Sequence, residues 1–363
     1  MHLPPGVDDP GFLTGPARFK KAVSNIHFVF NWSYIDSKHI AYALSGDMPQ
    51  RAKGTSPDFP VLGTGKYDWR GYNPGTHSAV WLPFLRHPQA VDPRFLVSWN
   101  NKQAPGWSAA DDQYTYTSIH RSQMISDKVR AGTRGARKMT IAQLVQAMEE
   151  PATQDLRGYR ILPLVFRAIG KPPKDVAGAL GRLKAWVKAG AHRRDLNQDG
   201  IYEHNSAVET MDAWWPLLVS AEFKPVMGQP LIDQLKTMTA NSLGDHTRTN
   251  PHAPDYLDYG WWGYVSKDLR DLFGPRPRGA WSRTYCGGGS VSKCRAVLRA
   301  SLREAIHVSP QALYGHGDCA GDPDPQCYDQ NRSVITSAIS VPPAPFQNRP
   351  TFQQTVSVTR NLP

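Results

Sequence analysis

The sequence predicts an α+β fold in which strands near the two ends of the chain flank a helical lobe. Three observations lead to this class. Aromatic and β-branched residues form two short runs near the start, helical periodicity begins at Thr140, and a strand pattern returns at Phe352–Val358. Ahead of the first strand, residues 1–25 begin as a loop and pass into a short helix, Pro16–Val23.

The first part of the chain predicts a β-hairpin. Residues Ile26–Ile35 and Ile40–Leu44 are rich in the residue types that favour strands, and Asp36-Ser37-Lys38 forms a tight turn between them. A long irregular segment runs from Pro49 to about Trp99 and ends in a short strand, Phe95–Ser98.

The middle of the chain predicts helices. Thr140 and Gln143 form a capping box, and Met139 with Leu144 forms a hydrophobic staple at the same helix start. Pro151 interrupts the apolar stripe that follows, and further helices are expected at 175–189, 207–220 and 294–306. The expected regions are a truncated junction at 1–25, a sheet portion at 26–125, a mainly helical lobe at 126–340 and a closing strand at 341–363.

Composition excludes several classes of protein. The chain has 363 residues, 40% of them hydrophobic and 20% charged, which is ordinary for a globular protein of one large domain or two. It has no unbroken apolar run long enough to span a membrane. The formal charge of +11 is scattered without a nucleic-acid-binding motif, so basic residues such as Arg193 and Arg194 are expected on solvated surface. The alternative is a field that steers anionic partners.

The four cysteines predict two local disulfides. Cys286 and Cys294 flank a Gly-Gly-Gly turn, and Cys319 and Cys327 flank a second polar turn. Four reduced thiols or one metal site are the alternatives, although zinc sites favour closer cysteine spacing. Disulfides imply an oxidising compartment, whereas Met1–Gly6 has no features of a signal peptide. We therefore expect a secreted or periplasmic full-length parent whose true N-terminus lies upstream.

Three segments of the chain, in order, carry a resemblance to a known family. They are Asn31–Asp36 with Ile40-Ala41-Tyr42 and Gly46–Pro49; Gly63–Gly71; and Ser98–Asn101 with Ala110–Asp112 and His120-Arg121. Their order and spacing resemble the later part of the large subunit in the penicillin acylase family of N-terminal-nucleophile amidases. The likeness continues through Gln154–Leu156, Leu162-Pro163, Trp214-Trp215 and Asn348–Gln354, and so covers nearly the whole chain.

The resemblance implies an incomplete αββα sandwich and a hydrolase that acts on linear amide C–N bonds of penicillins or other N-acyl substrates. In this family, cleavage of a precursor makes a Ser the N-terminus of the large subunit, where its own α-amino group acts as the base. The small subunit and the first part of the large subunit have no counterpart here, so we expect them as partners. Ser24 is an unsuitable nucleophile, because the family's Ser lies far upstream of the strand that begins near Asn31.

The resemblance also assigns two catalytic positions. Asn100 matches the family's oxyanion-stabilising Asn, and a neutral side-chain amide can donate to developing negative charge without titrating. Arg121 matches the arginine that orients that site through charge-assisted hydrogen bonds. The alternative is that Asn100 caps the end of a strand and Arg121 forms a surface ion pair.

Two segments are candidates for calcium. The family's structural calcium implies ligands at the Pro57 carbonyl and at Asp111, with Asp112 as the near alternative, and further ligands outside this chain. Separately, 195–202 imitates the first half of an EF-hand loop, but its twelfth position is Ser206 rather than a bidentate Glu. Both a calcium loop and an Asx-rich turn remain open there.

Two further functions remain possible from the sequence. The chain could be a non-catalytic remnant of an interrupted gene. It could also be a secreted aromatic-rich module that binds cell-wall polymers through residues such as Tyr256, Trp261 and Tyr264, although the density of these aromatic residues favours a packed core.

Overall fold

The computed structural model describes residues 6, 9, 11–55, 61–99, 101–105, 107, 119–239, 261–278, 283–315, 317–330 and 354–358, with the side chains of 119–121, 235–239 and 262 outside the description. The chain forms two compact units. The first, here the sheet unit, comprises Met1–Ser122, Val129–Arg137 and Gln354–Pro363. The second, the helical unit, comprises Gln123–Lys128 and Lys138–Gln353.

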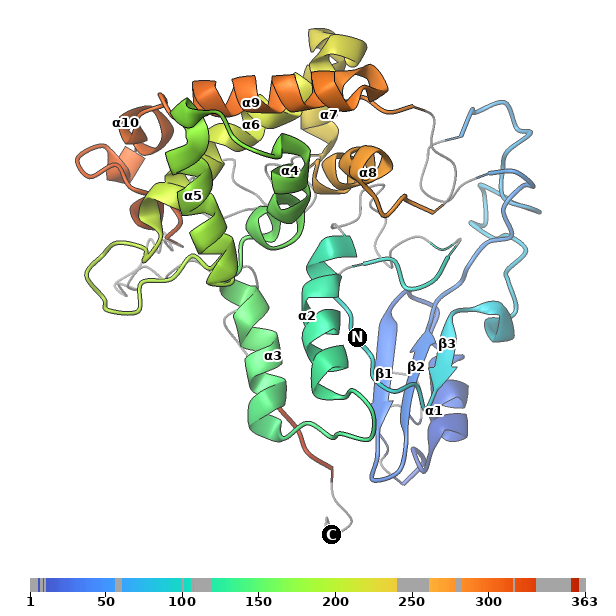
Figure 1. Cartoon of the computed structure of the whole chain (residues 1–363). Helices are drawn as coiled ribbons and strands as arrows, with labels where there is room; N and C mark the ends of the chain where they lie inside the picture. The colour runs from blue at the N-terminus through green and yellow to red at the C-terminus, as the bar shows by residue number, and fades with distance from the viewer. Residues whose placement is uncertain are drawn as a thin grey trace. The chain divides into compact units, whose positions relative to one another are not determined.

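An antiparallel sheet of three strands, in the order β1-β2-β3, organises the described part of the sheet unit (Figure 1). The strands are β1 (Asn31–Ile35), β2 (Ile40–Leu44) and β3 (Gln89–Val91). The predicted hairpin is confirmed, but β1 begins later than expected. The regular ladder ends where Ser45 N–H donates to the Phe30 carbonyl at 3.0 Å, and the pairing of residues 26–27 with 46–47 has a different register.

One face of this sheet is covered by α1 (Pro16–Val23), the helix that the sequence predicts. Phe19 and Val23 of α1 form a small buried cluster with Ala41 and Ala43 of β2. Tyr34 of β1 stacks on Phe19 with ring centroids 5.3 Å apart. Among the described residues, the core of the sheet unit is therefore a small cluster between α1 and one face of the sheet.

The strand expected at Phe95–Ser98 is not formed, and those residues are irregular. The third strand is instead β3, which pairs with Ala41–Ala43 of β2. The pairing stops at Asp92, whose N–H donates to the Ile40 carbonyl at 2.8 Å. The Ile40 N–H donates to the Asp92 side chain at 3.2 Å, and the φ of +52° at Asp92 turns the chain out of the extended conformation. Between β2 and β3, the turn η1 (Phe84–Arg86) follows the irregular segment.

The helical unit contains most of the helices that the structure describes. They are α2 (Ile119–Gly132, shared between the units), α3 (Ile141–Thr153), α4 (Leu162–Ile169), α5 (Lys174–Lys188), α6 (Asn205–Met227), α7 (Gln229–Thr239), α8 (Trp262–Phe273), α9 (Val291–Ala305), α10 (Pro310–Tyr314) and α11 (Pro325–Tyr328), with short turns η2 (Arg157–Ile161), η3 (Cys286–Gly289) and η4 (Gly317–Cys319). Helices α6 and α9 pack side by side (Figure 1). None of the helices in the described part is long and apolar enough to cross a membrane.

The core of the helical unit surrounds α6. Trp214 and Trp215 of α6 and Trp186 of α5 are almost fully buried. The indole N–H of Trp214 donates to Ser301 Oγ of α9 at 2.9 Å, so the buried polar atom is satisfied. The helix continues beyond the predicted 207–220, to Met227, although it contains Pro216 and Pro225. Burial of its apolar side chains compensates for the hydrogen bonds that each proline removes.

Local signals at the other helix ends are mostly confirmed. Thr140 and Gln143 form the predicted capping box at the start of α3. The predicted helix at 294–306 is observed as α9, and that at 175–189 as α5. By contrast, residues 354–358, the described part of the expected closing strand, have no regular secondary structure.

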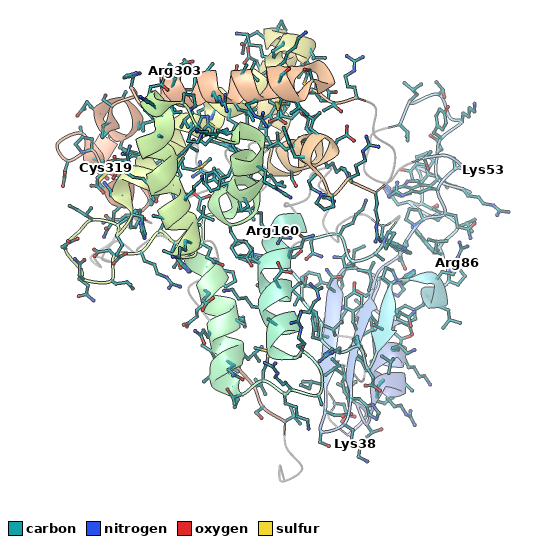
Figure 2. All side chains as sticks on the ribbon, in the orientation of Figure 1. Lys38, Lys53, Arg86, Arg160, Arg303 and Cys319 are labelled. Atoms are coloured by element: carbon teal, nitrogen blue, oxygen red, sulfur yellow. A yellow bond between two sulfur atoms is a disulfide. The ribbon has the colours of Figure 1, made fainter. Side chains whose placement is uncertain are left out.

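Both predicted disulfides are formed, Cys286–Cys294 and Cys319–Cys327 (Cys319 is labelled in Figure 2). The first pair depends on its glycine turn. Gly287 has φ +59°, and a Cβ there would lie 2.2 Å from the backbone N of Cys294. Only glycine allows η3 to approach the first turn of α9 this closely.

Candidate functional site

Most residues that the sequence assigns to catalysis or calcium lie outside the described residues. These are Asn100, Pro57, Asp111 and the alternative Asp112. Arg121 lies in the first turn of α2, and its side chain is not described. The structure therefore neither brings these residues together nor separates them, and the calcium site remains a prediction. The residues next to Asn100 in the sequence, Trp99 and Asn101, are described.

Asn101 uses its side-chain amide within its own turn. Its Oδ1 accepts from the backbone N–H of Trp99 at 2.9 Å, and its Nδ2 donates to the Lys102 carbonyl at 3.0 Å. The adjacent Trp99 is buried, with 7% of its surface exposed. Both ends of the Asn101 side-chain amide are thus engaged by the backbone of residues close to it in the sequence.

A buried histidine contacts Trp107, which lies a few residues after Asn101 in the sequence. His87 is 6% exposed, and its ring packs edge-on against Phe84 and Trp107, with centroids 5.4 and 5.7 Å away. His87 Nδ1 donates to the Leu44 carbonyl at 3.1 Å, because a carbonyl oxygen can only accept. Among the described residues its Nε2 has no hydrogen-bond partner, so it presents a bare acceptor beside Trp107. Sequence reasoning missed this residue, and nothing in its local pattern distinguishes it.

The helical unit holds a second polar centre, a buried network of two arginines and three aspartates. Arg157 forms ion pairs with Asp155 and with Asp212, both at 2.6 Å. Arg193 pairs with the same two aspartates and, at 2.7 Å, with Asp329. The expectation that Arg193 lies on solvated surface is wrong: it is 4% exposed, because three carboxylates compensate its charge in the core.

The carboxylates of this network differ in pKa. Burial alone would raise the pKa of Asp155, but the charges and hydrogen bonds of Arg157 and Arg193 hold that pKa at about 2. Burial raises the pKa of Asp329 to about 6, against the opposing charge of Arg193. The hydroxyls of Tyr202 and Tyr314 complete the network by donating to Asp329 and Asp212, at 3.0 and 2.8 Å. This arrangement joins residues that lie far apart in the sequence, so it links several elements of the helical unit.

The helical unit also contains two neighbouring buried carboxyl groups, Glu222 of α6 and Asp268 of α8. Both are 0% exposed. Asp268 accepts from the backbone N–H groups of Tyr285 and Cys286, each at 2.7 Å, and these bonds oppose the effect of burial, which raises the pKa of Asp268. Burial, and then the neighbouring Asp268, raise the pKa of Glu222 well above its usual value. This favours the protonated form of Glu222, which is able to donate to Asp268.

The segment that imitates an EF-hand forms a turn closed by its own side chains. Asp195 accepts from the backbone N–H groups of Asp199 and Gly200, and from the Gln326 side chain at 2.9 Å. The hydrogen bond from Gln326 is the main reason why the pKa of Asp195 lies below its usual value. These are the contacts of an Asx-rich turn. Within the described ranges, no three His, Cys, Asp or Glu side chains are grouped so that they could hold a metal ion.

Comparison with solved structures identifies the class of fold. A thermostable penicillin G acylase from Alcaligenes faecalis has a similar structure, with a TM-score of 0.57 and 18% sequence identity over 80% of this chain and 48% of that chain. The present chain therefore spans about half of that protein's chain. At this level of identity the likeness establishes the fold alone: a mixed helical and sheet fold of the penicillin acylase type.

Sequence comparison identifies the family. The penicillin amidase family profile matches residues 11–337, and the chain belongs to this family. It is 36% identical over 84 residues to a penicillin G acylase from Escherichia coli, a match that takes in 22% of this chain and 9% of the E. coli protein. The resemblance recognised in the sequence is thereby confirmed.

Proposed function

We propose that this chain supplies the oxyanion-stabilising part of an amidase that hydrolyses linear amide bonds of N-acyl substrates. The observation that carries the proposal is the match of the penicillin amidase family to residues 11–337. In the complete enzyme an N-terminal Ser attacks the substrate carbonyl, and this Ser comes from a partner polypeptide that also carries the small subunit. The sheet unit then forms part of an αββα sandwich.

Within this function, Asn100 donates to the oxygen that becomes negative during attack, and Arg121 orients that part of the site. The hydrogen bonds of Asn101 support the choice between the two neighbouring asparagines. Its Oδ1 and Nδ2 are both engaged in its own turn, whereas a catalytic amide must direct its N–H groups at the substrate. The two disulfides support maturation of the parent protein in a secreted or periplasmic setting.

The function is tested by supplying the partner polypeptide and measuring hydrolysis of a chromogenic phenylacetyl or fatty-acyl anilide. Asn100→Ala should lower kcat by about 10²–10³-fold with little change in KM, because the lost donor acts mainly on charge in the transition state. Arg121→Ala should have an intermediate effect. Asn101→Ala is the matched control and should be milder, since it alters a turn and not a donor.

Two results would contradict the proposal. One is an unchanged kcat in Asn100→Ala together with a much lower kcat in Asn101→Ala, which would place the oxyanion donor at Asn101. The other is full hydrolysis by this chain alone that disappears in Ser24→Ala, which would place the nucleophile at the residue that the sequence argument rejects.

A further inference from the structure

Six basic residues of the helical unit gather around the C-terminal end of α4. Helix α9 contacts both α4 and α5 there (Figure 1). These helices and the connection between α4 and α5 contribute the residues that are here called the basic surface: Arg167, Lys171, Lys174, Lys184, Arg295 and Arg299.

The two arginines of the basic surface bind the last carbonyls of α4. Arg295 Nε donates to the Ala168 carbonyl at 2.9 Å. Arg299 Nη2 donates to the carbonyls of Ile169 and Lys171 at 2.7 and 2.6 Å. These bonds offset the negative end of the α4 dipole. Carbonyl oxygens carry no net charge, however, so both arginines remain electrically uncompensated.

The other four residues carry charges that no described residue neutralises. All four side chains are exposed. No ion pair between described residues involves Arg167, Lys171, Lys174 or Lys184. Lys184 Nζ lies 5.7 Å from the centre of the Phe166 ring, which places this ammonium group of α5 against α4 beside Arg167. The four charges therefore belong to the same part of the surface as the two arginines.

Acidic residues do not balance this surface within the described part of the chain. Asp175 follows Lys174 directly, but it pairs with Arg303, so that pair adds no net charge. Glu304 comes nine positions after Arg295, which places it about half a turn further around α9. The whole chain has 31 acidic residues for 42 basic ones, so six uncompensated basic residues make this surface more basic than the chain as a whole.

The side chains of the basic surface indicate the chemistry of its ligand. Its arginines already bind carbonyls, so the exposed charges are mainly lysines, which bind phosphate groups as point charges. A helix that lies on a lipid surface inserts an apolar face into it. By contrast, α5 buries its apolar side chains in the core of the helical unit and exposes no large apolar residue. Charge complementarity thus favours a hydrated anionic chain over a membrane.

We propose that the basic surface binds a linear polyanion with closely spaced phosphate groups, which it recognises by charge alone. This inference goes beyond the proposed hydrolysis and does not depend on it. The surface supplies six cations to such a chain, and binding releases the counterions that the polyanion holds in solution.

The rival occupant is a segment of the same chain. Residues 240–260, outside the described residues, contain Asp245, Asp255 and Asp258, but also Arg248. The other undescribed segments of the helical unit, 279–282 and 331–353, contain no acidic residue. Three carboxylates and one arginine are too few to neutralise six cations, so the charge complementarity favours a separate polyanion.

Two triple variants with the same net charge test the proposal. The test variant replaces three lysines of the basic surface: Lys171→Gln, Lys174→Gln and Lys184→Gln. The control variant replaces three lysines of the sheet unit, all of them exposed (two are labelled in Figure 2): Lys21→Gln, Lys38→Gln and Lys53→Gln. Circular dichroism and the unfolding midpoint establish that both variants fold.

The measurement is the Kd of the full chain for long-chain inorganic polyphosphate with a fluorescent end label, determined by anisotropy. From about 50 to about 200 mM salt, the affinity of wild type should fall by at least about 100-fold. At the lower salt concentration the test variant should bind at least about tenfold more weakly, and its affinity should depend roughly half as steeply on salt. The control variant should bind like wild type.

Four results would overturn the proposal. A wild type that does not bind polyphosphate at the lower salt concentration would leave the six residues as ordinary solvated surface. Equal affinities of the two variants would mean that only the net charge of the chain matters. Binding to vesicles of equal parts phosphatidylcholine and phosphatidylglycerol, without binding to polyphosphate, would assign the surface to a membrane. Polyphosphate binding that occurs only in the double variant Asp255→Asn, Asp258→Asn would assign it to residues 240–260.

Discussion

The helical unit and the sheet unit differ in how completely they bury their own surfaces. In the helical unit, large side chains such as Trp186 and Trp214 are fully enclosed, and even its core charges are paired. In the described part of the sheet unit, α1 packs against one face of the sheet. Trp69, Tyr72 and Leu85 are exposed by 40%, 43% and 85%. The contrast indicates that the described core of the helical unit is much larger and more completely buried than that of the sheet unit.

The largest expected effect comes from breaking the buried network of the helical unit. Asp155→Ala should lower the free energy of unfolding by about 3–5 kcal/mol, because it leaves Arg157 and Arg193 with too little compensating charge in the core. Urea unfolding followed by tryptophan fluorescence measures this change.

The control for that prediction is an ion pair on the surface of the same unit. Arg303, labelled in Figure 2, pairs with Asp175, and both side chains are nearly half exposed. Asp175→Ala should leave the unfolding curve unchanged within error, since water already screens the pair. Equal effects of the two substitutions would mean that the buried network does not hold the helical unit together.

A smaller effect is expected from the proton shared by Glu222 and Asp268. Because the folded state raises the pKa of Glu222, the stability it contributes is present below its usual pKa and is lost as pH rises through the folded pKa. Burial raises the pKa of Asp268 as well, and the like charge of Asp271, on the same helix, raises it further. Stability should therefore fall on the alkaline side.

Glu222→Gln tests this sign. Glutamine can still donate to Asp268 but cannot ionise, so the alkaline loss of stability should flatten in the variant. The measurement is the free energy of unfolding from about pH 6 to about pH 9, with the exposed Glu149→Gln as control. A variant that keeps the wild-type slope would show that Glu222 is not the group responsible.

The elements that the sequence predicted correctly are those fixed by local chemistry. Asp36 Oδ1 accepts from the N–H groups of Lys38 and His39, at 2.7 and 2.6 Å, so the hairpin turn is specified by four residues alone. The capping box of Thr140 and the short loops of both disulfides are equally local. Such features can be predicted from the sequence because every interacting residue lies within a few positions of its partner.

The elements that sequence reasoning missed depend on distant partners. The burial of Arg193 depends on Asp155, Asp212 and Asp329, which lie 38, 19 and 136 residues away. The position of β3 depends on its pairing with Ala41–Ala43 of β2, which lie far from it in the sequence. For the candidate site, the sequence supplied Asn100 and Arg121 through family resemblance. The structure adds the hydrogen bonds of the Asn101 amide and the buried position of His87, whose Nε2 has no hydrogen-bond partner among the described residues.

Hydrogen exchange of the full chain alone, measured by mass spectrometry, tests the contrast between the two units most directly. Backbone amides in α5, α6 and α9 should exchange most slowly, because they open only when the closed helical core unfolds. Amides of β1 should exchange far faster. Protection of β1 as strong as that of α6 would contradict the account, since it would mean that the sheet unit is as stable as the helical core.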